Sequence, residues 1–360
     1  MTNKLGLYIH VPFCAGRCPY CDFYTKCADR ATRDAYVKAI QRDLLAREKE
    51  GYAFDTIYFG GGTPSVLDGT QVQTLLQVVR DHYSVAPDAE ITVECNPSSN
   101  LEDFLPKVAK AGVNRVSLGM QSAVDRERQL LGRKADRNRV EEALHIARDN
   151  GISNLSLDIM LGVPEQTMDS LHRTLDFCLQ TEVPHLSTYL LKLEEGTNFY
   201  RRRDKLALPS EETACTFYEE TTRVLTGAGF YHYEISNFCK DGKESRHNLK
   251  YWRCQHYLGL GPAAHSYLNG TRFYYPRDLD AYLSGAAPIP DGTGGSFPER
   301  LMLALRLAEG FSEPLPESVQ TKINLPYMAD YLTYDGTTLK LTERGFLVSN
   351  AVIGTLLEDY

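Results

Sequence analysis

The chain has 360 residues, 42% of them hydrophobic and 24% charged, which is the composition of a globular protein with one large domain and an appendage or with two domains. Its formal net charge of −8 argues against a non-specific nucleic-acid-binding surface, because that role needs a basic face. The sequence shows neither a signal-peptide pattern nor an apolar run near the roughly 18 residues of a membrane span, so we expect a cytoplasmic protein without a transmembrane segment, for which peripheral membrane contact stays open.

Six short runs rich in β-branched and aromatic residues alternate with amphipathic segments over the first 190 residues. The predicted strands occupy residues 6–11, 56–59, 89–94, 113–118, 154–159 and 184–190. The predicted helices, in which apolar residues recur at helical spacing, occupy residues 33–50, 71–83, 101–112, 137–151 and 168–181. This alternation predicts an α/β fold with a parallel sheet, either open or rolled into a partial barrel.

Polar and glycine residues follow five successive predicted strands, and their positions favour the barrel. In chain order these residues are Cys14, Cys18 and Cys21, the run 60–64 ("GGGTP"), Glu94, Gln121 and Asp158. The carboxyl ends of barrel strands form one mouth, whereas an open sheet concentrates its site at one switch point. We therefore predict a partial (β/α)6 TIM-type barrel.

The pattern changes after about residue 190. A further helix is predicted at residues 211–229, and a region rich in Tyr, His and Gly follows it to about residue 296. The rest of the sequence predicts a helix at 298–310, a β-hairpin at 338–349 and a final helix at 350–358. This order predicts a C-terminal α+β, winged-helix-like part, and we divide the chain into domains of residues 1–235 and 236–360.

Cys14, Cys18 and Cys21 have the spacing C-x3-C-x2-C. Nine cysteines in a chain without a leader pattern favour metal or catalytic roles over disulfides. A structural zinc site uses four ligands, and Cys27 is the candidate for the fourth. Three thiolates instead suit a [4Fe–4S] cluster in which one iron lacks a protein ligand and can bind an exogenous chelate. We predict the cluster and keep the zinc site as the alternative.

This spacing, with Tyr20 directly before the last cysteine, resembles the signature of radical S-adenosylmethionine enzymes. In that family the amine and carboxylate of S-adenosylmethionine chelate the open iron, and an electron from the cluster cleaves the sulfonium to a 5′-deoxyadenosyl radical. The glycine turn at residues 60–64 resembles the family's motif for the methionine amine. Glu94 is a candidate acceptor for ribose hydroxyls, and Arg133 for pairing with a carboxylate through its planar fork.

The whole chain is similar to the coproporphyrinogen III dehydrogenase (HemN) family, and within it to the branch of HemW-type haem chaperones. The matching stretches are "YIHVPFCAGRCPYCDF", "GGGTPS", "VECNP", "SLGMQS", "LGR", "DIMLGVPEQT" and "HNLKYWRCQHYLGLGPAAHSY". The resemblance implies a partial (β/α)6 barrel with a C-terminal helical and winged-helix-like part. It also implies S-adenosylmethionine sites lined by Tyr8, Gly61, Gly62, Thr63, Glu94, Gln121, Arg133 and Asp158.

Two differences separate the branches of that family. The dehydrogenases that resemble this chain carry a fourth cysteine two residues after the third, where this chain has Phe23. They also carry an extension ahead of the cluster, whereas the first cysteine here is residue 14. Both differences argue against porphyrinogen decarboxylation, and whether the chain is an enzyme is left open.

Residues 247–252 read His-Asn-x-x-Tyr-Trp, which resembles the HemW-type signature. A haem site needs an iron ligand, aromatic walls and a cation for the propionates. The candidates are His247 as ligand, with His256 and His265 as competing ligands. The candidate walls are Tyr251, Trp252 and Tyr257, and the candidate cations are Arg246, Lys250 and Arg253. In the alternative interpretation His247 is a packed, hydrogen-bonded residue. The motif would then hold the C-terminal part against the barrel mouth, which a glycine-rich turn at 257–267 would close.

From these patterns and the resemblance we expect a chain that binds a [4Fe–4S] cluster, S-adenosylmethionine and haem. The resemblance implies that it delivers haem to acceptor proteins such as respiratory haem enzymes. An oxygen-independent coproporphyrinogen III dehydrogenase-like enzyme is the main alternative, and another radical enzyme, such as a methyltransferase or a haem-opening enzyme, is the next. An electron donor and a second copy of the chain in a homodimer are the open partners.

Overall fold

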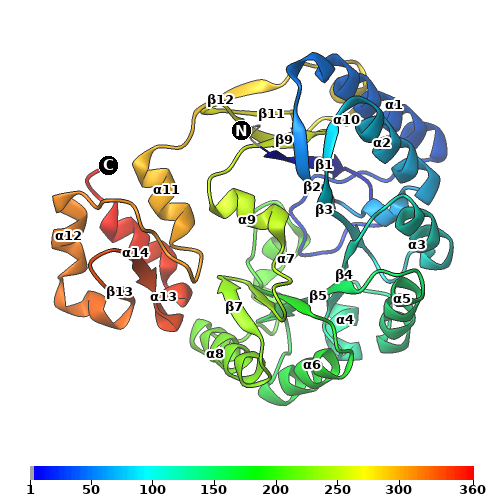
Figure 1. Ribbon diagram of the computed structural model, residues 1–360. Coiled ribbons are helices and arrows are strands. Elements are labelled where there is room, and N and C mark those ends of the chain that lie inside the picture. Colours follow the sequence, from blue (N-terminus) through cyan, green and yellow to red (C-terminus); the bar gives the residue numbers. More distant parts are fainter. Residues whose placement is uncertain (1–3) are drawn as a thin grey trace.

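The centre of the molecule is a curved sheet, which a computed structural model describes within residues 4–360. In that range the sheet has 12 strands in the order β12-β11-β10-β9-β1-β2-β3-β4-β5-β6-β8-β7. The first six strands pair in parallel in chain order. They are β1 (Lys4–Val11), β2 (Ala53–Gly61), β3 (Ser84–Cys95), β4 (Arg115–Gln121), β5 (Asn154–Leu161) and β6 (His185–Leu190). Figure 1 shows these strands rolled into a partial TIM-type barrel, as the sequence predicts.

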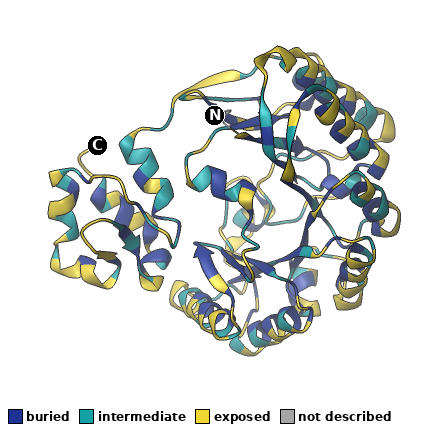
Figure 2. Cartoon of the chain, viewed as in Figure 1, coloured by how far each residue is buried: buried dark blue, intermediate teal, exposed yellow. Residues whose placement is uncertain are grey.

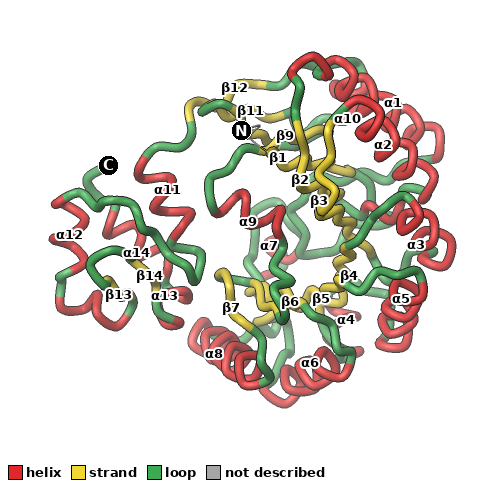
Figure 3. The backbone as a smooth tube through the Cα atoms, in the orientation of Figure 1, coloured by secondary structure: helices red, strands yellow, loops and turns green. Residues whose placement is uncertain are grey.

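Helices cover the outside of this barrel, and Figure 3 shows them as a ring around the strands. They are α1 (Arg30–Ala46), α2 (Gly69–His82), α3 (Leu101–Lys110), α4 (Asp125–Leu130), α5 (Arg137–Asp149), α6 (Met168–Gln180) and α8 (Glu211–Gly227). The short α7 (Asn198–Arg201) is not part of this ring: it lies against the loop after β1, where the Phe199 N–H donates to the Pro19 carbonyl at 2.9 Å. In α2, the buried residues Val72, Leu75, Leu76 and Val79 recur at helical spacing. The helices therefore bury one face against the sheet and expose the other, as Figure 2 shows.

The side chains of each strand divide between the two faces of the sheet. In β1, Leu7, Ile9 and Val11 are completely buried, and alternation places Tyr8 and His10 on the opposite face, toward the barrel interior. Burying such an aliphatic side chain contributes about 1.5–3 kcal/mol. The layer between sheet and helices is therefore apolar, whereas the barrel interior is free to carry polar chemistry.

Short strands extend both edges of the sheet beyond the six predicted ones. At one edge are β7 (Tyr231–Glu234) and β8 (Asn237–Cys239), and at the other β9 (Tyr257–Leu260), β10 (His265–Leu268), β11 (Thr271–Tyr274) and β12 (Ile289–Thr293). Strand β9 pairs in parallel with β1, and β8 pairs antiparallel with β6. The sheet thus continues across residue 235, where the domain boundary stays a prediction.

The turn predicted at residues 257–267 is partly wrong: β9 and β10 take up most of that stretch, and only residues 261–264 form a tight turn that joins them. Its glycines serve close packing of backbone instead. A Cβ on Gly261 would lie 2.5 Å from the carbonyl oxygen of His10, and a Cβ on Gly259 would collide with the carbonyl of His265. Gly261 also has a φ of 103°, which favours glycine. These positions let β9 fit between β1 and β10.

Helix α9 (Arg246–Trp252) fills the amino-terminal end of the barrel and lies within the curve of the sheet in Figure 1. A Cβ on Gly6, near the start of β1, would lie 3.1 Å from the ring of His247 and 3.0 Å from the stem of Lys250. Gly6 therefore makes room for the helix. The expectation that this motif packs against the barrel mouth is wrong, because α9 contacts the opposite ends of the strands.

The last part of the chain forms a separate α+β unit beside the barrel, as the sequence predicts (Figure 1). After α10 (Leu279–Leu283) its elements are α11 (Phe297–Ala304), α12 (Glu317–Ile323), β13 (Leu332–Tyr334), β14 (Leu339–Leu341), α13 (Glu343–Leu347) and α14 (Ser349–Leu356). The hairpin predicted at 338–349 is partly wrong: β14 pairs with the upstream β13, and Thr342 accepts a hydrogen bond from the Gly345 N–H, which starts α13 instead. No helix within residues 4–360 has the length and apolarity to traverse a lipid bilayer.

Candidate functional site

A cavity of about 360 Å³ opens at the carboxyl ends of the barrel strands. It collects most of the residues predicted for the cluster and for S-adenosylmethionine. Those that line it are Cys14, Cys18, Cys21, Gly61, Gly62, Thr63, Glu94, Gln121, Arg133 and Asp158. Of that predicted set, Tyr8 lies outside this cavity. The convergence follows from the topology, because parallel strands bring their carboxyl ends to one mouth; the role of each residue stays a prediction.

The three cysteines lie on the loop between β1 and α1, which is closed at its base by backbone hydrogen bonds. The Cys14 N–H donates to the Lys26 carbonyl at 3.1 Å and the Lys26 N–H to the Pro12 carbonyl at 2.7 Å, while a tight turn joins the Cys21 N–H to the Cys18 carbonyl at 3.2 Å. All three thiols are free and partly buried. Burial raises the pKa of Cys14 and of Cys21, so these thiols need a metal beside them to ionise near neutral pH.

This donor set fits an iron–sulfur cluster. Three thiolates facing one cavity are the soft ligands that such clusters use. Within the described residues, no three His, Cys, Asp or Glu side chains converge closely enough to hold a single metal ion. That spacing is expected when each thiolate binds a separate iron of one cluster. Thr63 adds a polar contact, with its Oγ1 3.3 Å from the Cys14 Sγ.

The glycine turn after β2 presses its backbone against the cysteine loop. The Gly62 N–H donates to the Val11 carbonyl at 2.9 Å, and the Thr63 N–H to the Phe13 carbonyl at 2.8 Å. Gly61 has a φ of 107°, and a Cβ there would lie 2.5 Å from the His10 ring. No side chain fits at Gly61 without a shift, so the turn keeps bare backbone exposed to the cavity.

Two carboxylates, Glu94 of β3 and Asp158 of β5, line the same cavity. Glu94 accepts hydrogen bonds from the Tyr58 hydroxyl at 2.7 Å and from the Gly61 N–H at 3.1 Å. Burial raises its pKa to about 7, and the charge of Asp158 adds to that rise. Asp158 accepts from the Ser117 hydroxyl at 2.8 Å, and burial raises its pKa to about 6. A cavity with two such carboxylates favours a cationic ligand.

Arg133 supplies the opposite charge at the rim of the cavity. Its guanidinium donates to the Gly119 carbonyl, and its Nη1 lies 3.9 Å from the Cys18 Sγ. Gln121, with a φ of 72°, ends β4 at an irregularity of the pairing with β5, which turns the chain at the mouth. A ligand with both a cation and a carboxylate therefore finds partners for both charges in one cavity.

Several lining residues are not among those predicted from the sequence, and the clearest are Ser117, Gly119, Met160 and Tyr189. A signal for them existed. Because side chains two apart share a strand face, Ser117 and Gly119 follow from Gln121, and Met160 follows from Asp158. Tyr189 lies on β6, where no polar residue drew attention.

Tyr8 lines a second, neighbouring cavity of about 510 Å³. Its hydroxyl is 3.0 Å from the Nδ1 of His10. Phe23 lines both cavities, so the residue at the position of the dehydrogenases' fourth cysteine lies between them. The position of Tyr8, three residues before the end of β1, places it deeper in the barrel than the mouth.

His247 lies in the closed end of the barrel, where it is completely buried. Its Nδ1 is 2.8 Å from the Thr56 hydroxyl and its Nε2 is 2.8 Å from the Tyr251 hydroxyl, while its ring stacks on Tyr58 at 5.1 Å. Both nitrogens are thus engaged, so this conformation offers no lone pair to an iron. The haem roles of His247, Tyr251 and Trp252 stay predictions.

The other two residues of the motif separate. Tyr251 lines the second cavity, whereas Trp252 packs beside a small apolar cluster of Tyr233, Cys239, Leu249 and Leu307. The motif therefore reaches the second cavity through its tyrosine, with His247 hydrogen-bonded behind it.

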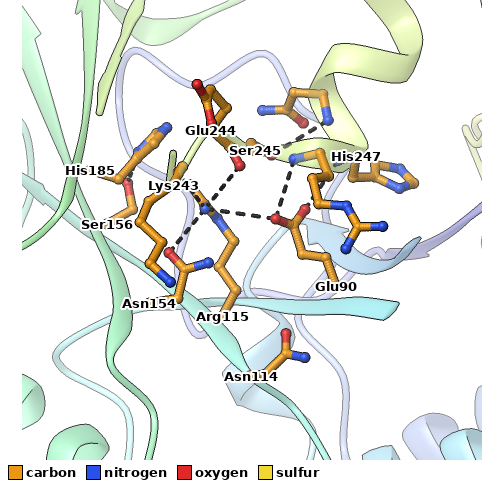
Figure 4. A network of polar contacts seen from close by, with 12 residues as sticks. Glu90, Asn114, Arg115, Asn154, Ser156, His185, Lys243, Glu244, Ser245 and His247 are labelled. Atoms are coloured by element: carbon orange, nitrogen blue, oxygen red, sulfur yellow. Dashed lines mark hydrogen bonds and ion pairs between the residues drawn. The ribbon is translucent and has the colours of Figure 1, made fainter. Parts of the chain in front are cut away.

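A buried polar network holds α9 in the barrel, and Figure 4 shows it from close by. Arg115, which is 2% exposed, donates to the Asn154 side chain at 3.0 Å and to the Lys243 carbonyl at 2.9 Å. It lies 3.7 Å from the Glu90 carboxylate. Glu90 in turn accepts from the N–H groups of Arg246 and His247 at 3.2 and 3.1 Å. This carboxylate satisfies backbone donors in the first turn of α9 that the helix itself leaves unpaired.

Comparisons with known proteins agree with this geometry. Residues 8–178 match the family model of the Radical SAM superfamily. A protein of Mycobacterium tuberculosis named heme chaperone HemW is 38% identical over 99% of this chain and 95% of its own length. Its namesake from Escherichia coli is 32% identical over 99% of this chain and 98% of its own. The solved structure of Escherichia coli coproporphyrinogen III oxidase (HemN), a radical SAM enzyme, has a TM-score of 0.86 and 21% identity, covering 98% of this chain and 90% of that one. At that identity, the likeness shows a shared fold.

Proposed function

We propose, from the premise that this chain belongs to the HemW-type branch of the radical SAM superfamily, that it is a haem chaperone. The named relatives align along nearly their whole lengths, so the chain has the counterpart of each of their parts. Haem binding rests on these relatives' names, and the cavity at the barrel mouth supports the cofactor part of the proposal, because it joins three free thiols, a bare glycine turn, two carboxylates and one guanidinium.

The cofactors are a [4Fe–4S] cluster and S-adenosylmethionine, as in the radical SAM superfamily. We assign Cys14, Cys18 and Cys21 to the cluster, which when loaded supplies one-electron chemistry and an open coordination position. The two carboxylates complement the cationic sulfonium and amine of S-adenosylmethionine, and Arg133 complements its carboxylate. Glu94 is the candidate partner of the ribose hydroxyls, since its oxygens accept hydrogen bonds.

Haem is the cargo in this proposal, and the chain passes it to acceptor proteins such as respiratory haem enzymes. The relatives' name supports haem binding, whereas the identity of the acceptor, an electron donor, a homodimer and the cytoplasmic location stay predictions. Tyr8 keeps its predicted place among the S-adenosylmethionine residues, although the cavity it lines is the neighbouring one.

A dehydrogenase-like activity is the second candidate, because the fold is that of coproporphyrinogen III oxidase. Phe23 is evidence against this activity. Its side chain is 61% exposed, has no thiol, and stands between the two cavities.

The deciding experiment combines binding, transfer and turnover on one sample. The cluster-reconstituted chain is titrated anaerobically with haem, mixed with an acceptor apoprotein, and separately assayed with coproporphyrinogen III and S-adenosylmethionine. We expect stoichiometric haem binding and transfer without decarboxylation. Carbon dioxide release that depends on Cys14, Cys18 and Cys21 would reject the chaperone in favour of the dehydrogenase.

A further inference from the structure

The second cavity has the chemistry of a porphyrin site. Its volume of about 510 Å³ lies within the roughly 300–1,000 Å³ of small-molecule and cofactor sites. Six tyrosines and Phe23 form most of its lining, which also includes two histidines, one alanine and Arg277, and among these lining residues there is no carboxylate. Aromatic walls with a cation at the rim fit a flat conjugated ring that carries carboxylates.

One histidine of this cavity has free ring nitrogens. His265 starts β10, its side chain is 60% exposed, and its Nδ1 lies 4.0 Å from the Oδ2 of Asp291. Within the described residues neither ring nitrogen has a hydrogen-bond partner, in contrast to His10, whose two nitrogens face the Tyr8 hydroxyl and the Tyr24 carbonyl.

The ring of His265 is also held in place. It stacks on Tyr274 with ring centroids 5.2 Å apart and planes at 23°. The stacking orients the imidazole while its two ring nitrogens stay without a hydrogen-bond partner in the described part of the chain.

Arg277 supplies a cation on the cavity lining. Its side chain is 58% exposed and lies 3.5 Å from the Asp22 carboxylate, with a hydrogen bond of 2.8 Å to the Asp22 carbonyl. Such an exposed pair costs little to rearrange, so the guanidinium is available for a propionate.

We propose that haem, on the premise of the proposed function, binds in this aromatic cavity with His265 as iron ligand and Arg277 beside a propionate. His247 is then a positioning residue: its Nε2 lies 2.8 Å from the hydroxyl of Tyr251, which lines the cavity. Phe23, common to both cavities, places the haem next to the cluster loop.

The test compares His265→Ala with His256→Ala in the full-length, cluster-loaded chain. His256 is the matched control, because it does not line this cavity and its ring centroid lies 5.4 Å from that of Tyr267. Anaerobic haem titrations are read at the Soret band against the haem-free protein, with ligand assignment by electron paramagnetic resonance. His265→Ala should raise the Kd at least about tenfold, since losing even an outer-shell partner costs a metal site that much, and should remove the imidazole signature. His256→Ala should change neither.

Unchanged affinity and spectrum in His265→Ala would overturn the proposal, including the case in which a tyrosinate is the ligand. His247→Gln is the second variant. We expect it to weaken haem binding while the imidazole signature remains; loss of that signature in His247→Gln, with His265→Ala unaffected, would make His247 the ligand. A wild-type chain that binds no haem at all rejects the proposed function itself, which separates the two failures.

Discussion

Replacing Arg115 by methionine removes the central cation of the network that holds α9. The side chain is 2% exposed, and the change leaves the Asn154 side chain and the Lys243 carbonyl without their donor. It also leaves the Glu90 carboxylate, 3.7 Å away and 5% exposed, without a counter-ion. Breaking a buried pair by removing one partner costs about 3–5 kcal/mol. We therefore expect the free energy of unfolding to fall by about that amount.

The measurement is urea unfolding followed by far-ultraviolet circular dichroism at pH 7. Arg253→Met is the control, because Arg253 pairs with Glu309 at 2.8 Å with side chains 41% and 49% exposed, and such pairs contribute about 0–1 kcal/mol. Adding Glu90→Gln to Arg115→Met should recover part of the loss, since no buried charge is then left alone. Equal, small effects of the two methionine variants would refute the argument that this network fastens α9.

Three further predictions concern the cavity at the mouth. Cys14→Ser should abolish iron and sulfide incorporation, measured chemically after reconstitution, whereas Cys27→Ser should retain it. Loss in both would make Cys27 a fourth cluster ligand and contradict the open iron, and uptake of zinc without sulfide by the unchanged chain would favour the zinc site. Gly61→Ala should lose S-adenosylmethionine binding in calorimetry, because the new Cβ would lie 2.5 Å from the His10 ring. Gly151→Ala is the control and should keep the binding, because Gly151 has a φ of 82° but nothing within 4 Å of its Cβ position. Equal losses in the two variants would mean that backbone strain alone explains the effect. Burial raises the pKa of Glu94 to about 7. The stability that this shift gives to the ligand-free fold is fully present below about pH 4.5 and is lost as the pH rises through 7. Glu94 is also ionised at pH 8 and mostly neutral at pH 5.5, and the ionised carboxylate is the form that complements the cationic groups of S-adenosylmethionine, so the ligand should bind more tightly at pH 8; a Glu94→Gln variant with the same pH dependence would contradict this.

The sequence predicts the barrel and its mouth well because both rest on strong local patterns. The predicted strand at 154–159 lies within β5 (Asn154–Leu161), and the helix predicted at 168–181 is α6 (Met168–Gln180). These segments are long enough for their hydrophobic periodicity to be recognised, and the parallel topology then brings the carboxyl ends of the strands together. The convergence of Cys14 and Glu94 on one cavity follows from that order.

The sequence predicts poorly where contacts between distant segments decide the structure. Strand β9 has four residues, too few for an alternating pattern, and its glycines resemble a turn until β1 and β10 are placed beside it. The His-Asn-x-x-Tyr-Trp motif at 247–252 combines a histidine with aromatic residues. This combination is compatible both with a haem-binding site and with a helix packed in the protein interior. Only the position of Thr56 and Glu90, far away in the sequence, shows that its first turn is anchored.

The pairing of β1 with β9 has a consequence for the synthesis of the chain. Strand β1 (Lys4–Val11) is synthesised well before β9 (Tyr257–Leu260), and one of its edges stays unpaired until β9 has been made. An open edge of an apolar strand is a template for wrong pairing, and closing so long a loop is slow. The cysteine loop follows β1 directly, so we expect it to reach its final surroundings late in translation. Iron–sulfur loading would then come after most of the chain is already complete.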